Sequence, residues 1–243
     1  MSRCTVKAKR TQVCVIMSSP AKPSMKERIL ETADRLFYLQ GIRAVGVDTV
    51  AAEIGISKRT LYNHFPSKNA LISAYLERRF RPVPTSDKPP AEQILRTFDR
   101  LERGFADKGF RGCPFVNAVA EMGAGDHAVR KIAIAFKDSR RAWFRDLLLQ
   151  LDVAHPDELA TQFQLLVDGA IATDLVRNDP SVARAAKDAA RVLLRNAGIE
   201  VGPPDQAHKP GRVAKKRSSS PRRRGPIRRD GAVQNRRLLQ DLF

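Results

Sequence analysis

The chain has 243 residues, enough to give one large domain or two small ones a hydrophobic core without help from disulfides or metals. Its formal net charge of +18 favours a polyanionic partner. No apolar run approaches the roughly 18 residues of a membrane helix, and the charged start lacks a secretory signal, so we expect a cytoplasmic protein rather than a membrane protein.

Most of the excess positive charge lies at the two ends of the chain. Residues 1–23 contain five Lys or Arg and no acidic residue, and residues 200–243 contain twelve against four. Residues 24–81 contain ten against six, whereas residues 82–199 contain seventeen against sixteen. We therefore expect a nearly neutral body, a modestly basic segment before it, and two strongly basic tails.

Residues 1–23 show no helical period and end in a sequence with two prolines, Ser18-Ser19-Pro20-Ala21-Lys22-Pro23, which disfavours a helix. We interpret them as a flexible basic arm. Three alternatives stay open for this arm: simple disorder, binding along a DNA groove, and translation that begins at Met17 or Met25.

Two amphipathic helices are expected next. Ser24 followed three residues later by Glu27 has the spacing of a capping box, and apolar residues then repeat at helical spacing until Gly41. A second, shorter helix covers residues 47–54 and stops at Gly55, because glycine accepts the left-handed backbone common just after a helix. Together they indicate the first part of a helix-turn-helix.

A third expected helix carries the candidate DNA-binding residues. Ser57 caps it, and Leu61 and Phe65, four residues apart, face inward. Its outer surface then bears cationic, hydroxyl, amide and aromatic side chains: Lys58, Arg59, Thr60, Tyr62, Asn63 and His64. Each of these alone could equally be a solvated or packing residue. As a set that follows a helix–glycine–helix turn, they indicate a recognition helix for the major groove.

A fourth helix, with Ser67 as its cap, should run from Ser67 to about Phe80 and end before four prolines that mark a linker over residues 82–90. This linker divides the chain into an expected DNA-binding domain, residues 24–81, and an expected second helical domain, residues 91–199. The sequence therefore predicts an all-α fold.

The second domain is expected to contain five helices. The first starts at Ala91 and ends at Gly109, and a short one begins at Pro114, where the missing N–H costs nothing. Asp126 caps a long helix, and residues 157–177 and 180–196 form the last two.

From Met25 to about Phe80 the chain resembles the DNA-binding domain of the TetR-type transcriptional regulators. The matching residues keep a fixed spacing over the whole stretch and include Phe37 with Gly41, Val50-Ala51, Gly55-Ile56-Ser57, Leu61-Tyr62, His64-Phe65, Ser67-Lys68 and Leu71. One departure is Gly46, where the family usually has Ser or Thr. Glycine is a tolerable helix cap that is weaker by a few tenths of a kcal/mol.

The resemblance implies a function and a set of residue roles. It implies a homodimer, paired through the last two helices, that represses transcription from a palindromic double-stranded DNA operator until a small-molecule effector binds. The roles that it implies are base contacts for Lys58, Arg59, Thr60 and Asn63, and contacts with the DNA backbone for Tyr62, His64 and Lys68.

The resemblance also implies an effector pocket in the second domain. The candidate lining residues are mostly apolar and could equally be plain core: Phe98, Phe105, Cys113, Phe115, Asn117, Met122, Trp143, Phe144 and Phe163. Cys113 has two alternatives. Beside Arg111 and at a helix start, its thiolate could be favoured as in redox-sensing cysteines, or it could be a buried, inert thiol.

Residues 200–243 are too charged and too poor in apolar residues to fold, so we expect a disordered basic tail that binds DNA phosphates without sequence preference, or an altered reading frame. This tail supports a rival hypothesis of a general DNA-coating protein. The chain contains no catalytic set, phosphate-binding loop or dinucleotide fingerprint, and its three cysteines lack metal-site spacing. We expect no enzymatic activity, no cofactor and no metal.

Overall fold

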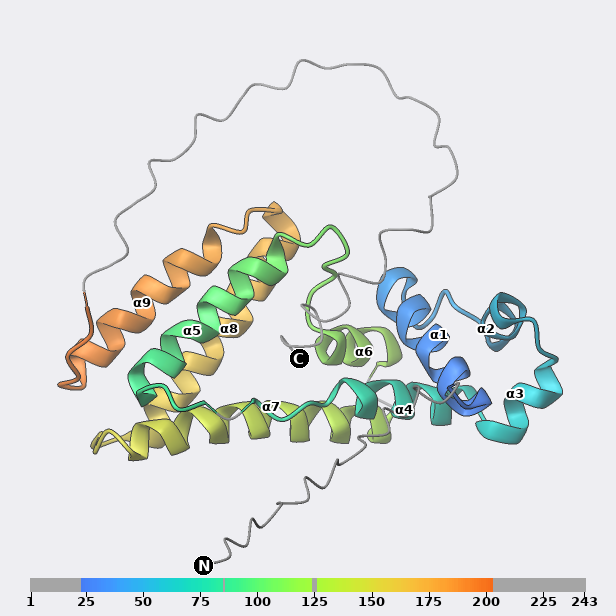
Figure 1. The fold of residues 1–243 in the computed structure, drawn as a ribbon, viewed down its shortest axis with the longest axis horizontal. Helices are drawn as coiled ribbons and strands as arrows, with labels where there is room; N and C mark the ends of the chain where they lie inside the picture. Colours follow the sequence, from blue (N-terminus) through green and yellow to red (C-terminus); the bar gives the residue numbers. More distant parts are fainter. Residues whose placement is uncertain (1–22, 85, 124–125, 203–243) are drawn as a thin grey trace, which may run out of the picture.

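A computed structural model of the chain describes residues 23–84, 86–123 and 126–202. These residues form nine α-helices and no strand, so the prediction of an all-α fold is confirmed (Figure 1). The predicted basic arm lies outside the described residues up to residue 22, and the predicted basic tail lies outside them from residue 203.

The first four helices are α1 (Met25–Gln40), α2 (Val47–Ile54), α3 (Lys58–His64) and α4 (Lys68–Arg79). Their starts follow the predicted caps. Ser24 and Glu27 form both hydrogen bonds of the capping box, and the hydroxyls of Ser57 and Ser67 accept backbone N–H groups of their own helices. Because these caps satisfy free amides at each helix start, short segments of chain become well-defined helices.

These four helices enclose a shared apolar core. Helix α1 packs against α2 and α4, and α3 packs against α2. The core comprises side chains from all four helices, with Ile29, Ala33, Val50, Leu61, Leu71, Ile72 and Leu76 fully buried. The core holds α3 with one face inward and the other face outward.

The other helices are α5 (Pro90–Phe105), α6 (Pro114–Met122), α7 (His127–Leu149), α8 (Pro156–Arg177) and α9 (Val182–Asn196). Helix α7 is the longest and contacts α4, α5, α6 and α8, while α9 packs on α5 and α8. In Figure 1, α4 and α7 lie along the same edge of the molecule. Helix α4 follows α3, and α7 belongs to the helical body.

Two helix ends differ from the sequence prediction. Helix α5 ends at Phe105 and not at Gly109, because the Asp107 carboxylate accepts the Gly109 N–H at 2.7 Å and closes a turn there. Helix α9 begins at Val182, two residues later than predicted, because Asp179 accepts the Ser181 N–H at 3.0 Å. In both places an aspartate competes with the helix for backbone donors.

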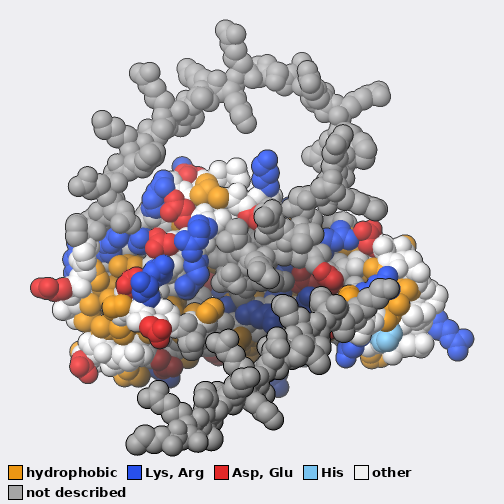
Figure 2. Space-filling view, in the orientation of Figure 1, with side chains coloured by type: hydrophobic (Ala, Val, Ile, Leu, Met, Phe, Trp, Pro, Cys, Tyr) orange, Lys and Arg blue, Asp and Glu red, His pale blue; other side chains and the backbone are white. Residues whose placement is uncertain are grey.

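The buried side chains of both predicted domains belong to one continuous hydrophobic cluster. On the face seen in Figure 2, acidic and basic side chains are interspersed over the helical body. Within the part of the chain that the structure describes, no helix has both the length and the apolar character needed to cross a membrane.

Candidate nucleic-acid interface and effector cavity

A sharp turn between α2 and α3 sets the direction of the candidate recognition helix. Gly55 adopts a left-handed backbone with φ 71°, which is unfavourable for residues with a Cβ. Ser57 then accepts the Thr60 N–H at 3.1 Å, while Leu61 and Phe65 are buried in the core. Burial of this inner face fixes which side chains of α3 face solvent.

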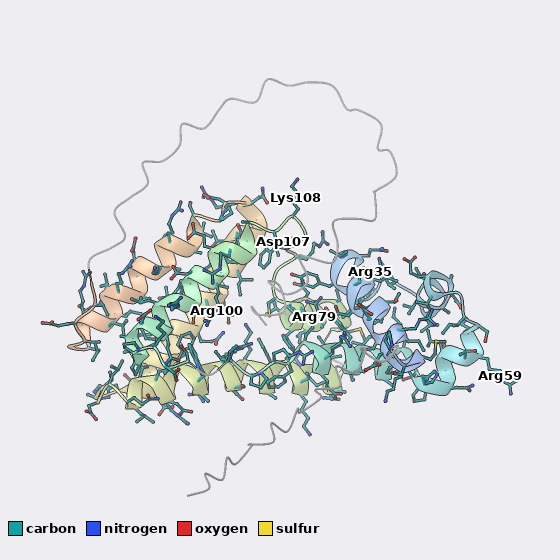
Figure 3. The ribbon with its side chains drawn as sticks, viewed as in Figure 1. Arg35, Arg59, Arg79, Arg100, Asp107 and Lys108 are labelled. Atoms are coloured by element: carbon teal, nitrogen blue, oxygen red, sulfur yellow. The ribbon has the colours of Figure 1, made fainter. Side chains whose placement is uncertain are left out.

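The structure brings the seven predicted DNA-contacting residues to one end of the molecule, on α3 and the start of α4. Lys58, Arg59, Tyr62, Asn63 and His64 are exposed, whereas Thr60 and Lys68 are half-buried. Arg59 points away from the body at the outer tip of α3 (Figure 3). This end therefore presents cationic and hydrogen-bonding groups to a partner of sufficient size.

Two of these side chains have partners within the protein, and the pKa of a third is shifted. The Lys58 ammonium pairs with Asp48 of α2 at 2.9 Å, and this hydrogen bond raises the pKa of Lys58. The Thr60 hydroxyl lies 2.9 Å from the Ser57 hydroxyl, so it contributes to the helix cap. Burial lowers the pKa of Lys68, although the carboxylate of Glu121 on α6 acts in the opposite direction.

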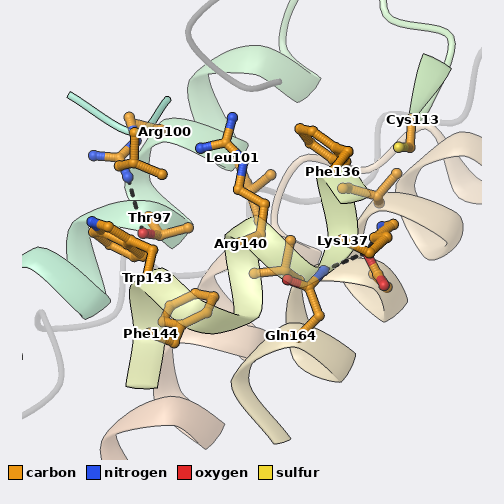
Figure 4. A pocket seen from close by; sticks show the side chains of 14 residues that line it. Thr97, Arg100, Leu101, Cys113, Phe136, Lys137, Arg140, Trp143, Phe144 and Gln164 are labelled. Carbon is orange, nitrogen blue, oxygen red and sulfur yellow. Dashed lines mark hydrogen bonds and ion pairs between the residues drawn. The ribbon is translucent and has the colours of Figure 1, made fainter. Parts of the chain in front are cut away.

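A cavity lies between α5, α7 and α8, close to the chain that follows α4. Its enclosed volume is about 40 Å³, or about 520 Å³ when adjoining space open to solvent is included. It is lined by both apolar and charged side chains: Val83, Thr97, Arg100, Leu101, Cys113, Phe136, Lys137, Arg140, Trp143, Phe144, Gln164, Val167, Asp168 and Ile171 (Figure 4). We call this the effector cavity.

Three of the nine predicted pocket residues line the effector cavity: Cys113, Trp143 and Phe144. Phe115 lines a separate groove between α6 and α7 that is more open to solvent. Phe98, Phe105 and Phe163 are buried core residues, and Met122 packs against that core. The Asn117 amide donates a hydrogen bond to the Arg111 carbonyl at 2.6 Å, so it holds the loop before α6.

Cys113 lies just before α6 and is buried. Burial raises the pKa of its thiol, and the positive charge of Lys137 only partly opposes this effect. The structure therefore favours the protonated thiol over the thiolate, which supports the inert alternative.

Sequence reasoning missed the charged residues of the cavity, chiefly Arg100, Lys137 and Arg140. A signal for one of them existed. Arg140 follows Phe136 by four residues and precedes Trp143 by three, so helical spacing places it on the same face of α7 as those two aromatic residues. An arginine within an apolar stripe indicates a buried charge with a specific role.

Residues that line the effector cavity contact the segment directly after α4. Phe80, directly after α4, packs edge-on against Phe115 and Phe136, with ring centroids 6.3 and 5.7 Å apart. Phe136 also lines the cavity, and Arg140 donates a hydrogen bond to the Arg81 carbonyl at 3.1 Å. Two residues that line the cavity, Phe136 and Arg140, therefore contact the chain that directly continues α4.

Three hydrogen bonds join the first helices to α6 and the loop before it. The Tyr38 hydroxyl of α1 lies 3.1 Å from the Gly112 carbonyl, to which it donates, and it accepts the Arg111 N–H at 3.0 Å. The Glu121 carboxylate of α6 accepts the Arg43 N–H at 2.9 Å. These bonds fix the position of the first four helices against α6.

A three-helix unit with a glycine turn and a cationic third helix, mounted on a larger helical body, defines the helix-turn-helix class of transcriptional regulators. Residues 29–75 match the model of the bacterial regulatory proteins of the tetR family.

Solved structures of two other regulators show the same fold. The structure of a TetR-type transcriptional regulator from Streptomyces avermitilis is 30% identical, with 73% of this chain and 100% of that chain covered and a TM-score of 0.66. A TetR-family regulator from Streptomyces coelicolor is 31% identical over 70% of this chain and 94% of that chain, with a TM-score of 0.64.

A sequence relative is the HTH-type transcriptional regulator YjdC of Escherichia coli. It is 25% identical over 185 residues, which cover 73% of this chain and 97% of the relative. The chain belongs to the TetR family of transcriptional regulators, a family of regulators and not of enzymes.

Proposed function

We propose that this regulator is a ligand-responsive repressor that binds a palindromic operator as a homodimer and leaves it when a small-molecule effector binds. The observation that carries the proposal is the contact between residues that line the effector cavity and the segment directly after α4. Helix α4 begins at Lys68, close after the recognition helix, and ends at Arg79, one residue before Phe80, which packs against the cavity residue Phe136. One rigid helix thus connects the proposed ligand site to the proposed DNA contacts.

Exposure and position support the residue roles that the family resemblance implies. Arg59, Asn63 and Lys58 would contact base edges in the major groove, since they project from the outer face of α3. Tyr62, His64 and Lys68 would hold the DNA backbone. Thr60 would contact a base edge through its methyl group, or through its hydroxyl after giving up the hydrogen bond with Ser57.

The homodimer would form through α8 and α9. Leu165, Gly169, Ala172 and Val176 repeat at helical spacing along α8, and all four are exposed. Val192 of α9 is exposed as well. A continuous stripe of small and apolar residues on a surface helix is typical of a helix-packing interface.

A dimer would place two recognition helices about 34–36 Å apart, one turn of DNA. Ligand binding would displace the end of α4, change that separation and weaken operator binding, because the ligand binds the two states with unequal affinity.

Selection of bound sequences from a random DNA pool tests the DNA-binding part of the proposal. We expect a palindrome whose half-sites lie about one DNA turn apart. The Lys58→Ala/Asn63→Ala double variant should lose this preference. Binding without sequence preference that is unchanged in the double variant would contradict a specific regulator.

The rival function, general DNA coating through the basic tails, makes the opposite prediction. A chain that ends at residue 202 keeps every described helix. It would keep its site preference if the recognition helix selects DNA, and would lose most of its binding if the tail does.

A further inference from the structure

The effector cavity carries more positive than negative charge. Arg100, Lys137 and Arg140 line it, and Asp168 is the acidic side chain among its lining residues. Lys137 forms an ion pair with Asp168, which also accepts a hydrogen bond from Gln164 at 3.1 Å. The one lining carboxylate is therefore already engaged by Lys137 and Gln164.

Arg140 has neutral partners only. Its guanidinium donates to the Arg81 carbonyl at 3.1 Å and lies over the Phe136 ring, 5.0 Å from the centroid, and no acidic side chain pairs with it within the described residues. Burial, together with the neighbouring charge of Arg100, lowers the pKa of Arg140 to about 10, so it stays protonated at neutral pH. An anion placed beside the guanidinium groups of Arg140 and Arg100 would reduce the repulsion between these two positive charges.

The rest of the cavity suits an apolar group with one polar substituent. Trp143 and Phe144 lie on one side of Arg140 in Figure 4, and Leu101, Val167 and Ile171 complete an apolar wall. The Gln164 side-chain oxygen is buried and has no hydrogen-bond partner among the residues described. It is therefore available to accept a bond from a hydroxyl or N–H group.

We propose that the effector is an organic acid whose carboxylate binds between Arg140 and Arg100 and whose apolar body lies against Trp143 and Phe144. This inference rests on the proposed function, since it gives the chemical class of the effector. Arginine suits the role because its planar guanidinium binds carboxylates through two parallel hydrogen bonds. The enclosed volume of about 40 Å³ holds the carboxylate, while the body extends along the open part of the site towards Val83.

The same binding event explains how the ligand acts on α4. A carboxylate on Arg140 competes with the Arg81 carbonyl for the guanidinium donors. An apolar body near Val83 displaces the chain that directly continues α4. Both effects disturb the segment after Phe80, and neither requires contact with the DNA-binding helices.

Trp143 provides a direct readout, because it is the only tryptophan of the chain and lines the cavity. Octanoate and phenylpropanoate would be titrated into the DNA-free full-length protein, each against its primary amide, which matches it in shape but carries no charge. Tryptophan emission and calorimetry follow binding. We expect each acid to bind at least about tenfold more tightly than its amide, a difference of about 1.4 kcal/mol.

Variants locate the carboxylate. Arg140→Gln should weaken acid binding about tenfold or more and leave amide binding nearly unchanged, and Arg100→Gln should act in the same direction. The matched control is Arg141→Gln in the same helix, because Arg141 pairs with Asp157 at 3.1 Å and does not line the cavity. Thermal unfolding followed by circular dichroism checks that each variant is folded.

Any of three results would overturn the inference. The protein could bind acids and amides with equal affinity, it could bind neither acid, or its acid binding could be unchanged in Arg140→Gln and Arg100→Gln. If the protein selects a palindrome but binds neither acid, the organic-acid class of effector is wrong and the proposed regulatory function stands. If it binds the acids through Arg140 but selects no DNA sequence, the effector class stands and the proposed regulatory function is wrong.

Discussion

The guanidinium of Arg79, at the end of α4, donates two hydrogen bonds to the carboxylate of Asp34 on α1, at 2.6 and 3.1 Å. The guanidinium also lies over the ring of Tyr38, 4.1 Å from its centroid, and the Arg79 side chain is only 9% exposed. This pair ties the last turn of α4 to the first helix of the DNA-binding unit. Movement of α4 therefore carries α1 with it.

Asp34→Asn should lower the free energy of unfolding by about 3 kcal/mol, because it leaves the buried Arg79 charge without its carboxylate. Urea unfolding at neutral pH measures this change. Arg35→Gln on the same helix is the control. Arg35 pairs with Glu53 at a partly exposed site, so its loss should cost less than about 1 kcal/mol. Equal costs for the two variants would contradict a structural role for the Arg79 pair.

Tyr38→Phe should destabilise the protein by about 1–3 kcal/mol at neutral pH, because the Arg111 N–H and the Gly112 carbonyl lose their partner. Urea unfolding again measures the loss. The exposed Tyr62→Phe is the matched control and should change stability by less than about 0.5 kcal/mol.

The same tyrosine predicts a pH dependence. Burial raises the pKa of Tyr38 to about 12, whereas an unfolded tyrosine ionises near about 10. The contribution of Tyr38 to the free energy of unfolding is complete below pH ~10. It is lost as the pH rises towards ~12, by about 2–3 kcal/mol in total. The stability difference between wild type and Tyr38→Phe should therefore shrink over this interval. A constant difference would show that Tyr38 ionises normally in the folded protein.

Asp48→Asn should strengthen operator binding about two- to fivefold at low salt. The change removes a negative charge from the proposed DNA-binding surface and frees Lys58 from its ion pair. Glu53→Gln removes one negative charge from the same helix at a residue that pairs with Arg35, and it should have a smaller effect. Fluorescence anisotropy with a labelled operator at several salt concentrations would distinguish the two.

Cys113 should react slowly with a thiol reagent in the folded protein, because burial keeps its thiol protonated and covered. In a Cys4→Ser/Cys14→Ser variant, Cys113 is the remaining cysteine. We expect native labelling at pH 7 to be roughly a hundredfold slower than labelling in urea. Rapid native labelling would restore the redox-sensor alternative.

Features set by neighbouring residues could be predicted from the sequence. The caps at Ser24, Ser57, Ser67 and Asp126 are all present, because a cap depends on a side chain and an amide three residues away. The outward face of α3 was predictable as well, since Leu61 and Phe65 determine its orientation. The DNA contacts assigned to that face remain a prediction.

The cavity was harder to predict because it depends on how distant helices meet. Phe98 and Phe163 were sound candidates by type, yet their helices turn them into the core. Arg140 was overlooked because its charge suggested a solvated position, whereas its guanidinium contacts the Arg81 carbonyl after α4 and the Phe136 ring. Residue type indicates which side chains are buried but not which cavity they line.

Leu165→Glu and Val176→Glu should each convert the dimer into monomers. These side chains are 64% and 86% exposed on the proposed interface of α8. In a twofold dimer each substitution occurs twice, so either variant replaces two apolar side chains of the proposed interface with desolvated charges. We expect the dimer dissociation constant to rise by about a hundredfold or more, as measured by light scattering over a dilution series.

The matched control is Ile134→Glu on α7, which places the same charge at a residue that is 54% exposed and lies outside the stripe on α8. It should remain dimeric. The monomeric variants should also lose operator affinity while keeping their helical content, because one recognition helix then reaches only one half-site. If Leu165→Glu and Val176→Glu remain dimeric, another face of the molecule must form the dimer, and the separation of the recognition helices would have to be set through that face.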